Sequence, residues 1–169
     1  MRTTTSLGLT LAIALTVAAL SPTLAGDAAQ AQFDKLKGLA GDWVKSGGDG
    51  SVVVNYRLTA AGTAVVETLL VGTPHEMVTV YTMDAGDVVL THYCAQGNQP
   101  HMRAAKGGDA SAIAFKFDGG GNLKSPKDGH MHELTVAFKD ADHITTTWQY
   151  YQDGKPGEKA EFNLVRKTS

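Results

Sequence analysis

Cysteine, excess charge and long apolar runs are all scarce in this chain of 169 residues. Its single cysteine, Cys94, excludes an internal disulfide, so a fold of this length has to be stabilised by its core. Charges of the two signs nearly balance, with 15 Lys and Arg against 17 Asp and Glu. This composition gives no reason to expect nucleic acid or an anionic membrane surface as a partner.

The one long apolar run, Leu7–Leu20, follows Arg2 and precedes the small-x-small pattern Thr23-Leu24-Ala25. Its length of about 14 residues is short of the roughly 20 that a membrane-spanning helix needs. We therefore predict a signal peptide over residues 1–25, cleaved before Gly26 or near Ala31, and a mature protein without a membrane span. The expected location is the periplasm or the extracellular medium; an uncleaved membrane anchor is the alternative.

Residues 26–169 have the length of one domain and read as one short helix followed by a meander of strands. Helix formers and apolar spacing predict the helix at Asp27–Leu39. Ten runs rich in Val, Thr, Tyr and Ile, each bounded by turn residues, predict strands. They lie near 42–46, 51–60, 63–71, 76–83, 88–95, 100–106, 112–118, 131–139, 143–152 and 159–166. This spacing predicts an all-β fold, most simply a ten-stranded antiparallel up-and-down barrel, with a two-sheet sandwich as the alternative.

The stretch Thr91–Arg103 holds the cysteine and two of the six histidines. A two-residue turn at Gly97-Asn98 would place Cys94 opposite His101 and His92 opposite Arg103. Because opposite residues share a face of the sheet, this register predicts one cluster of a thiol, two imidazoles and a guanidinium.

A second hairpin has a three-residue turn at Asp140–Asp142 in the register that places apolar and aromatic side chains on one face. In this register Leu134 faces Trp148, and His132 faces Tyr150. The long break Gly119–Gly129 is expected to be a loop, either a lid over a cavity or a variable surface segment.

Gly41-Asp42-Trp43 follows the short helix and opens the ten-strand meander, and it resembles the Gly-x-Trp start of the calycin superfamily. That group includes lipocalins, fatty-acid-binding proteins and nitrobindin-like haem barrels. The segments Thr91–Cys94, Gly97–Pro100 and Asp128–His132 also resemble an exported bacterial family of lipocalin-like domains. The resemblance implies a barrel whose interior holds a small apolar molecule and whose end is closed by packing of Trp43. In nitrobindin-like barrels the haem ligand is a histidine near the C-terminal end, whereas the last histidine here is His143.

We predict a non-enzymatic barrel, monomeric or homodimeric, that binds a small, largely apolar molecule without a cofactor. The predicted ligand-binding residues combine the clustered polar groups with aromatic walls. They are His92, Cys94, His101, Arg103, His132, Trp148, Tyr150, Phe115 and Tyr81, with Tyr56 and Phe117 as further wall residues.

Four alternatives remain open for the same residues. The histidines and Arg103 could be structural, paired with carboxylates such as Glu67 or Glu76. His92, Cys94, His101 and His132 could hold zinc or haem, although no Cys-x-x-Cys or His-Glu-x-x-His pattern is present. Cys94 and His101 could act as nucleophile and base, without a recognisable oxyanion hole. Finally, a barrel packed solid by aromatic side chains would favour a protein that binds a partner on its exterior.

Overall fold

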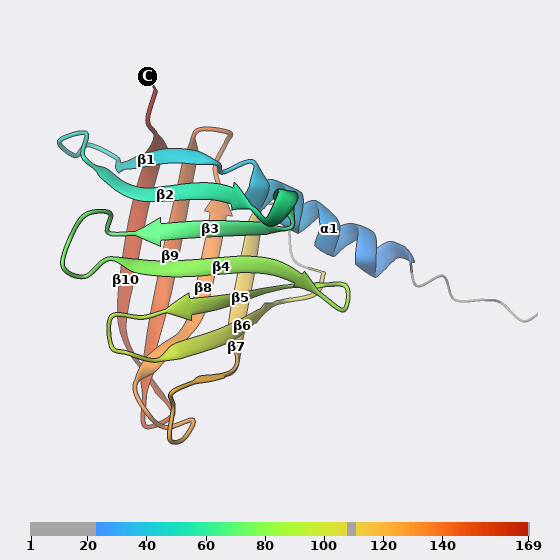
Figure 1. Ribbon diagram of the computed structural model, residues 1–169, viewed down its shortest axis with the longest axis vertical. Helices are drawn as coiled ribbons and strands as arrows, with labels where there is room; N and C mark the ends of the chain where they lie inside the picture. The colour runs from blue at the N-terminus through green and yellow to red at the C-terminus, as the bar shows by residue number, and fades with distance from the viewer. Residues whose placement is uncertain (1–22, 108–110, 169) are drawn as a thin grey trace, which may run out of the picture.

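The computed structural model describes residues 23–107 and 111–168 as a closed antiparallel barrel with a helix at one end (Figure 1). Each strand pairs with its neighbours in the chain, and the first strand pairs with the last to close the barrel. The elements are α1 (Thr23–Lys37), β1 (Gly41–Lys45), β2 (Val52–Thr59), β3 (Ala64–Leu69), β4 (Met77–Asp84), β5 (Asp87–Tyr93), β6 (Gln99–Ala104), β7 (Ala112–Gly121), β8 (His130–Phe138), β9 (His143–Gln152) and β10 (Lys155–Arg166). A short 3₁₀ turn, Ala60–Gly62, joins β2 to β3. The predicted all-β, ten-stranded barrel with an N-terminal helix is confirmed.

Helix α1 begins four residues before the predicted start and ends two residues earlier than predicted. Phe33, Leu36 and the following Leu39 are buried against the barrel, because their spacing places them on the inner face of the helix and its exit. Residues 1–22 of the predicted signal peptide lie outside the described residues. None of the described helices combines the length and the apolar character needed to cross a membrane.

Alternation along the strands fills the barrel with one face of each strand. The largest fully buried side chains include Trp43, Trp148, Tyr56, Tyr81 and Phe115. Tyr81 and Phe115 touch inside the barrel, with ring centroids 5.7 Å apart. The predicted wall residues Tyr81, Phe115 and Trp148 therefore do face inward.

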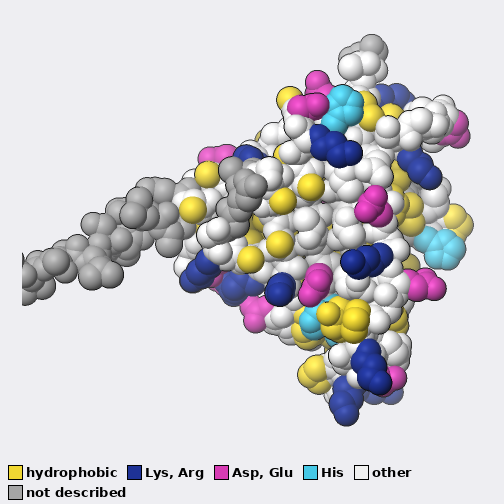
Figure 2. Space-filling view, turned by 180° about the vertical axis from the view of Figure 1, so that it is seen from behind, with side chains coloured by type: hydrophobic (Ala, Val, Ile, Leu, Met, Phe, Trp, Pro, Cys, Tyr) yellow, Lys and Arg dark blue, Asp and Glu magenta, His cyan; other side chains and the backbone are white. Residues whose placement is uncertain are grey.

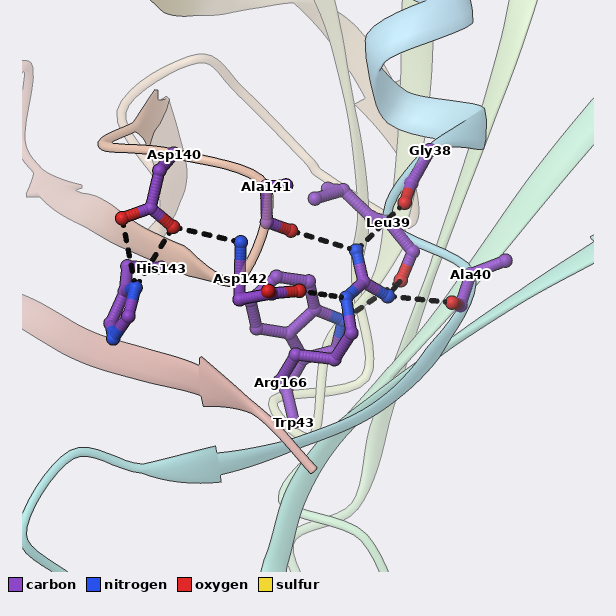
Figure 3. A network of polar contacts seen from close by, with 9 residues as sticks. All are labelled: Gly38, Leu39, Ala40, Trp43, Asp140, Ala141, Asp142, His143 and Arg166. Carbon is purple, nitrogen blue, oxygen red and sulfur yellow. Dashed lines mark hydrogen bonds and ion pairs between the residues drawn. The ribbon is translucent and has the colours of Figure 1, made fainter. Parts of the chain in front are cut away.

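The end of the barrel next to α1, here called the helix end, is closed by Trp43 and Arg166 (Figure 3). The Trp43 indole donates to the carbonyl of Leu39 at 2.8 Å, and the Arg166 guanidinium lies 4.5 Å from the indole ring. Arg166 also donates hydrogen bonds to backbone carbonyls and one carboxylate around it, at Gly38, Ala40, Ala141 and Asp142. These bonds join the segment between α1 and β1, at Gly38 and Ala40, to the β8–β9 turn, at Ala141 and Asp142. Trp43 thus closes one end of the barrel, as the resemblance implies.

The predicted register of the β5–β6 hairpin is wrong. Thr91 pairs with His101 and Val89 with Arg103, so His101 and Arg103 point outward while His92 points inward. The turn contains three residues rather than two: Gly97 donates to Cys94, Cys94 donates to Asn98, and Gly97 has a φ of 85°. This is a type I turn followed by a glycine in the left-handed region, which displaces the pairing and reverses the faces.

The register of the β8–β9 hairpin is confirmed from Phe138 to Glu133: Leu134 pairs with Trp148, and Glu133 pairs with Gln149. Beyond Glu133 the prediction is wrong, because a bulge between Met131 and Glu133 leaves His132 without a Cα partner. Tyr150 pairs with Met131 instead of His132.

The predicted loop at Gly119–Gly129 is shorter than expected, because β7 continues to Gly121. Gly120 crosses so close to the backbone of Gln99 and Pro100 that a Cβ there would lie 2.9 Å from both. The remaining loop is ordered by Asp128, whose carboxylate accepts from the Lys124 backbone at 2.7 Å.

Candidate functional site

A row of polar side chains crosses the inside of the barrel from β2 to β5. Tyr56 pairs with Glu67, Glu67 with Thr79, and Thr79 with His92, so the four residues share the inner face on adjacent strands. Glu67 and Thr79 are 0% exposed, and His92 is 1% exposed. Buried polar groups of this kind persist only when hydrogen bonds replace the water that they lose.

Glu67 is the acceptor at the centre of this row. The Tyr56 hydroxyl donates to one carboxyl oxygen at 3.0 Å, and the Tyr81 hydroxyl donates to the other at 2.7 Å. Thr79 lies opposite Glu67 on the neighbouring strand. Burial raises the pKa of Glu67 above its usual value, while the hydroxyl groups of Tyr81, Tyr56 and Thr79 act in the opposite direction. The same burial, together with Glu67, raises the pKa of both tyrosines.

His92 ends the row and is uncharged near neutral pH, because burial lowers its pKa to about 4. Its Nδ1 lies 2.9 Å from the Thr79 hydroxyl oxygen. Nδ1 donates or accepts in this contact according to the tautomer of the neutral ring, and Nε2 takes the opposite role toward a partner of its own.

Three buried polar atoms in this part of the barrel have no hydrogen-bond partner among the described residues: His92 Nε2, Trp148 Nε1 and Thr146 Oγ1. The rings of His92 and Trp148 are in contact, with centroids 4.5 Å apart. Thr146 lies two residues before Trp148 on β9 and therefore faces the same interior. Nearly all buried polar atoms in folded proteins have a partner, so three such atoms on the inner face mark a region where a bound group could supply the missing partners. We call His92, Thr146 and Trp148 the interior triad.

The end of the barrel opposite α1, here called the far end, holds two more histidines. His130 Nδ1 lies 2.7 Å from the Asp128 carbonyl and is its donor, and His130 Nε2 lies 2.9 Å from His132 Nδ1. Phe117 lies 4.2 Å from the His130 ring, and Tyr151 stacks on His132 at 4.0 Å. Desolvation lowers the pKa of His132.

Two side chains tie the loops of the far end together. Asn98 donates to the Gly129 carbonyl at 2.8 Å, and Asn122 donates to the Gly97 carbonyl at 2.6 Å. These two hydrogen bonds join the β5–β6 loop to the β7–β8 loop at the end of the barrel that holds His130 and His132.

The remaining predicted site residues are not part of the interior. Arg103 lies on the outer face, where its guanidinium contacts Asp84, Asp87 and Asp118 at 2.9, 3.3 and 3.0 Å. The carboxylates of Asp84 and Asp118 raise its pKa. Figure 2 shows Lys, Arg, Asp and Glu side chains interspersed on one outer face of the barrel.

His101 is exposed, and Cys94 is only partly buried at the start of the turn. The Tyr150 hydroxyl donates to Gln152 at 2.8 Å. The structure therefore unites four of the nine predicted residues inside the barrel, namely His92, Tyr81, Phe115 and Trp148, and places His132 at the far end.

Thr79 and Thr146 were not predicted as site residues, and Glu67 was expected only as a partner of the histidines and Arg103. Their signal is the alternation Val65, Glu67, Leu69 and Ile144, Thr146, Trp148, in which a polar residue occupies an inward position. A polar residue at such a position is the informative exception in an otherwise apolar face.

Within the described ranges, no three His, Cys, Asp or Glu side chains gather as a metal ion would require. The proposed set of His92, Cys94, His101 and His132 is not brought together, because His101 lies on the outer face of the sheet and His92 on the inner face. The His130–His132 pair supplies two imidazoles in direct contact but no third ligand of this kind.

No family model matches the sequence, and the search of curated proteins finds no match. The class that the structure defines is thus a closed ten-stranded antiparallel barrel, an architecture compatible with the calycin-like fold and with ligand binding in its interior.

Proposed function

We propose that this protein is an exported, calycin-like barrel that binds one small, largely apolar molecule in its interior. The single observation that supports this most strongly is the interior triad, whose three buried polar atoms have no partner among the described residues. Ligand sites in proteins are mostly apolar with a few placed polar groups, and the triad lies among the buried aromatic side chains of such a wall.

Barrel size supports the same proposal. Eight strands enclose a space that side chains can fill or that holds one small ligand, and the width grows with the number of strands. Ten strands therefore enclose a wider interior than eight strands do. Small inward residues such as Thr79 and Thr146 lie beside the larger rings in this half of the barrel.

A filled barrel that binds a partner on its exterior is the competing proposal. The observation that favours it is the number of large aromatic side chains among the fully buried residues. The interior triad argues against it, because a core selected only for packing would place Val or Phe where Thr146 and Trp148 stand.

Native mass spectrometry of the protein purified from its own host tests the proposal. We expect one organic molecule of low mass per chain, and the same spectrum reports whether the protein is a monomer or a homodimer. A mass increase equal to a metal ion or haem would instead support the cofactor alternative. Apoprotein with no added mass, which also fails to bind the neutral fluorophore N-phenyl-1-naphthylamine, would overturn ligand binding.

The variant pair His101→Ala and Trp148→Phe provides the internal control for fluorophore binding. His101 is exposed on the outer face, whereas Trp148 is buried in the interior. We expect His101→Ala to bind the fluorophore with the affinity of the unaltered protein, and Trp148→Phe to bind it with a changed affinity. Export is tested separately: N-terminal sequencing of protein collected outside the cytoplasm should begin at Gly26 or near Ala31.

A further inference from the structure

The charges around the interior triad restrict the polar group of any molecule bound there. The only charged or chargeable partners in the adjoining row are Glu67, its two tyrosines and the uncharged His92. Arg103 points outward into three carboxylates, and Arg166 is bound at the helix end to Asp142 and to backbone carbonyls. An anion placed beside the triad would therefore be buried without a cation and close to an acidic group, which is strongly unfavourable.

The hydrogen-bonding capacity of the triad narrows the choice further. Trp148 Nε1–H can only donate, His92 Nε2 donates or accepts according to the tautomer of the ring, and the Thr146 hydroxyl can do both. A hydroxyl group can pair with Trp148 and with His92 in either tautomer, whereas a ketone or ester oxygen can pair with His92 in only one of them. An ammonium group would leave Trp148 Nε1–H without an acceptor.

We infer that the molecule held in the barrel is an alcohol: an apolar body that ends in one uncharged hydroxyl group, which accepts from Trp148 Nε1–H and pairs with His92 Nε2 or Thr146. This inference rests on the proposed function and specifies the chemical class of its ligand. It also reassigns the anchoring role from Arg103 and His101, which lie on the outer face, to His92, Thr146 and Trp148 on the inner face.

Three probes with the same ten-carbon chain test the inference on the unaltered full chain by calorimetric titration at pH 7.5. They are 1-decanol, decanoate and decylammonium. We expect 1-decanol to bind at least about tenfold more tightly than either charged probe, because only the hydroxyl group satisfies both a donor and an acceptor without burying a charge. This ranking needs no variant, so it does not depend on whether an altered core folds.

Two variants then locate the contact. Trp148→Phe keeps an aromatic ring and removes the N–H, and Thr146→Val removes the hydroxyl at similar shape. Each should weaken 1-decanol binding about threefold to tenfold, the cost of one neutral hydrogen bond, and should leave the weak binding of decanoate unchanged. His101→Ala, on the outer face, is the control and should bind 1-decanol like the unaltered protein.

The outcomes separate the two proposals. Decanoate or decylammonium binding as tightly as 1-decanol would overturn the hydroxyl assignment and leave interior ligand binding standing. Equal loss of all three probes in Trp148→Phe would also overturn the assignment, since it would mean that Trp148 acts only as a wall. Binding of no probe, together with an apoprotein that carries no ligand from its host, would overturn both.

Discussion

The helix end and the interior triad use similar side chains in opposite ways. At the helix end, the Trp43 indole donates to the Leu39 carbonyl, and the Arg166 guanidinium donates to the carbonyls of Gly38 and Ala40. The buried donors there are thus satisfied by acceptors of the chain itself. At the triad, the Trp148 indole is equally buried and donates to nothing among the described residues. A buried tryptophan N–H therefore indicates neither a structural nor a binding role by itself. An acceptor within the chain indicates a structural role, and the lack of one among the described residues indicates a binding role.

Replacing Arg166 by Ala should have the largest effect on stability. It removes the hydrogen bonds to three backbone carbonyls and to the Asp142 carboxylate, and it removes the cation that lies on the face of the Trp43 indole. We expect a loss of about 3–4 kcal/mol in the free energy of unfolding, measured by urea denaturation. Arg57→Ala is the control, because Arg57 is exposed. Equal midpoints for the two variants would show that the helix end contributes little to stability.

The stability of the protein should fall in acid because of His92. Its pKa is lowered to about 4 from the usual 6.5. Between these two pH values, His92 is therefore protonated in the unfolded chain and remains neutral in the folded chain. The contribution of neutral His92 to the free energy of unfolding is complete above pH 6.5 and is lost as the pH falls to about 4. The loss is about 1.4 kcal/mol per pH unit and about 3 kcal/mol in all.

The His92→Asn variant isolates this contribution, because Asn keeps an amide donor near Nδ1 and does not titrate. The difference in unfolding free energy between the two proteins should shrink as the pH is lowered from 7.5 to 4. A difference that stays constant over this range would contradict the neutral, buried imidazole. Glu67, whose raised pKa favours the folded state in acid, is present in both proteins and cancels.

Removing one hydroxyl group should have opposite consequences in the two kinds of polar environment. Tyr81→Phe removes the 2.7 Å donor to Glu67 and should cost about 1–2 kcal/mol. Thr146→Val removes a buried hydroxyl that has no partner in the chain, so apoprotein stability should be unchanged or raised by up to about 1 kcal/mol. Parallel urea titrations check the pair. A Thr146→Val apoprotein as destabilised as Tyr81→Phe would show that Thr146 has a partner of its own.

The smallest effect is expected on the outer face. Arg103→Ala breaks ion pairs with Asp84, Asp87 and Asp118, yet the guanidinium side chain is 35% exposed and solvent screens the interaction. We expect only a small lowering of the urea midpoint, which becomes smaller still in 0.5 M salt. Ligand affinity should not change. If Arg103→Ala lowered the affinity for the ligand without lowering stability, Arg103 would have to contact the ligand after all.

The strands of this protein could be predicted from its sequence because alternation and turn residues are local signals. All ten strands occur where the runs of Val, Thr, Tyr and Ile predict them, and the three-residue turn at Asp140–Asp142 sets the register that apolar pairing favours. The β5–β6 register was wrong because Gly97 was assigned to a two-residue turn, whereas it follows a type I turn in the left-handed region. A different turn length was enough to move His101 and Arg103 to the outside.

By itself the sequence determined the strand order, the inward alternation and the burial of Tyr81, Phe115 and Trp148, since these follow from periodicity along each strand. Only the tertiary structure decided which polar side chains meet. Glu67, Thr79 and His92 are neighbours because three strands pair in one register, and Trp148 reaches His92 because the sheet closes on itself. Contacts across a closed barrel join residues distant in the chain, and no local pattern encodes that distance.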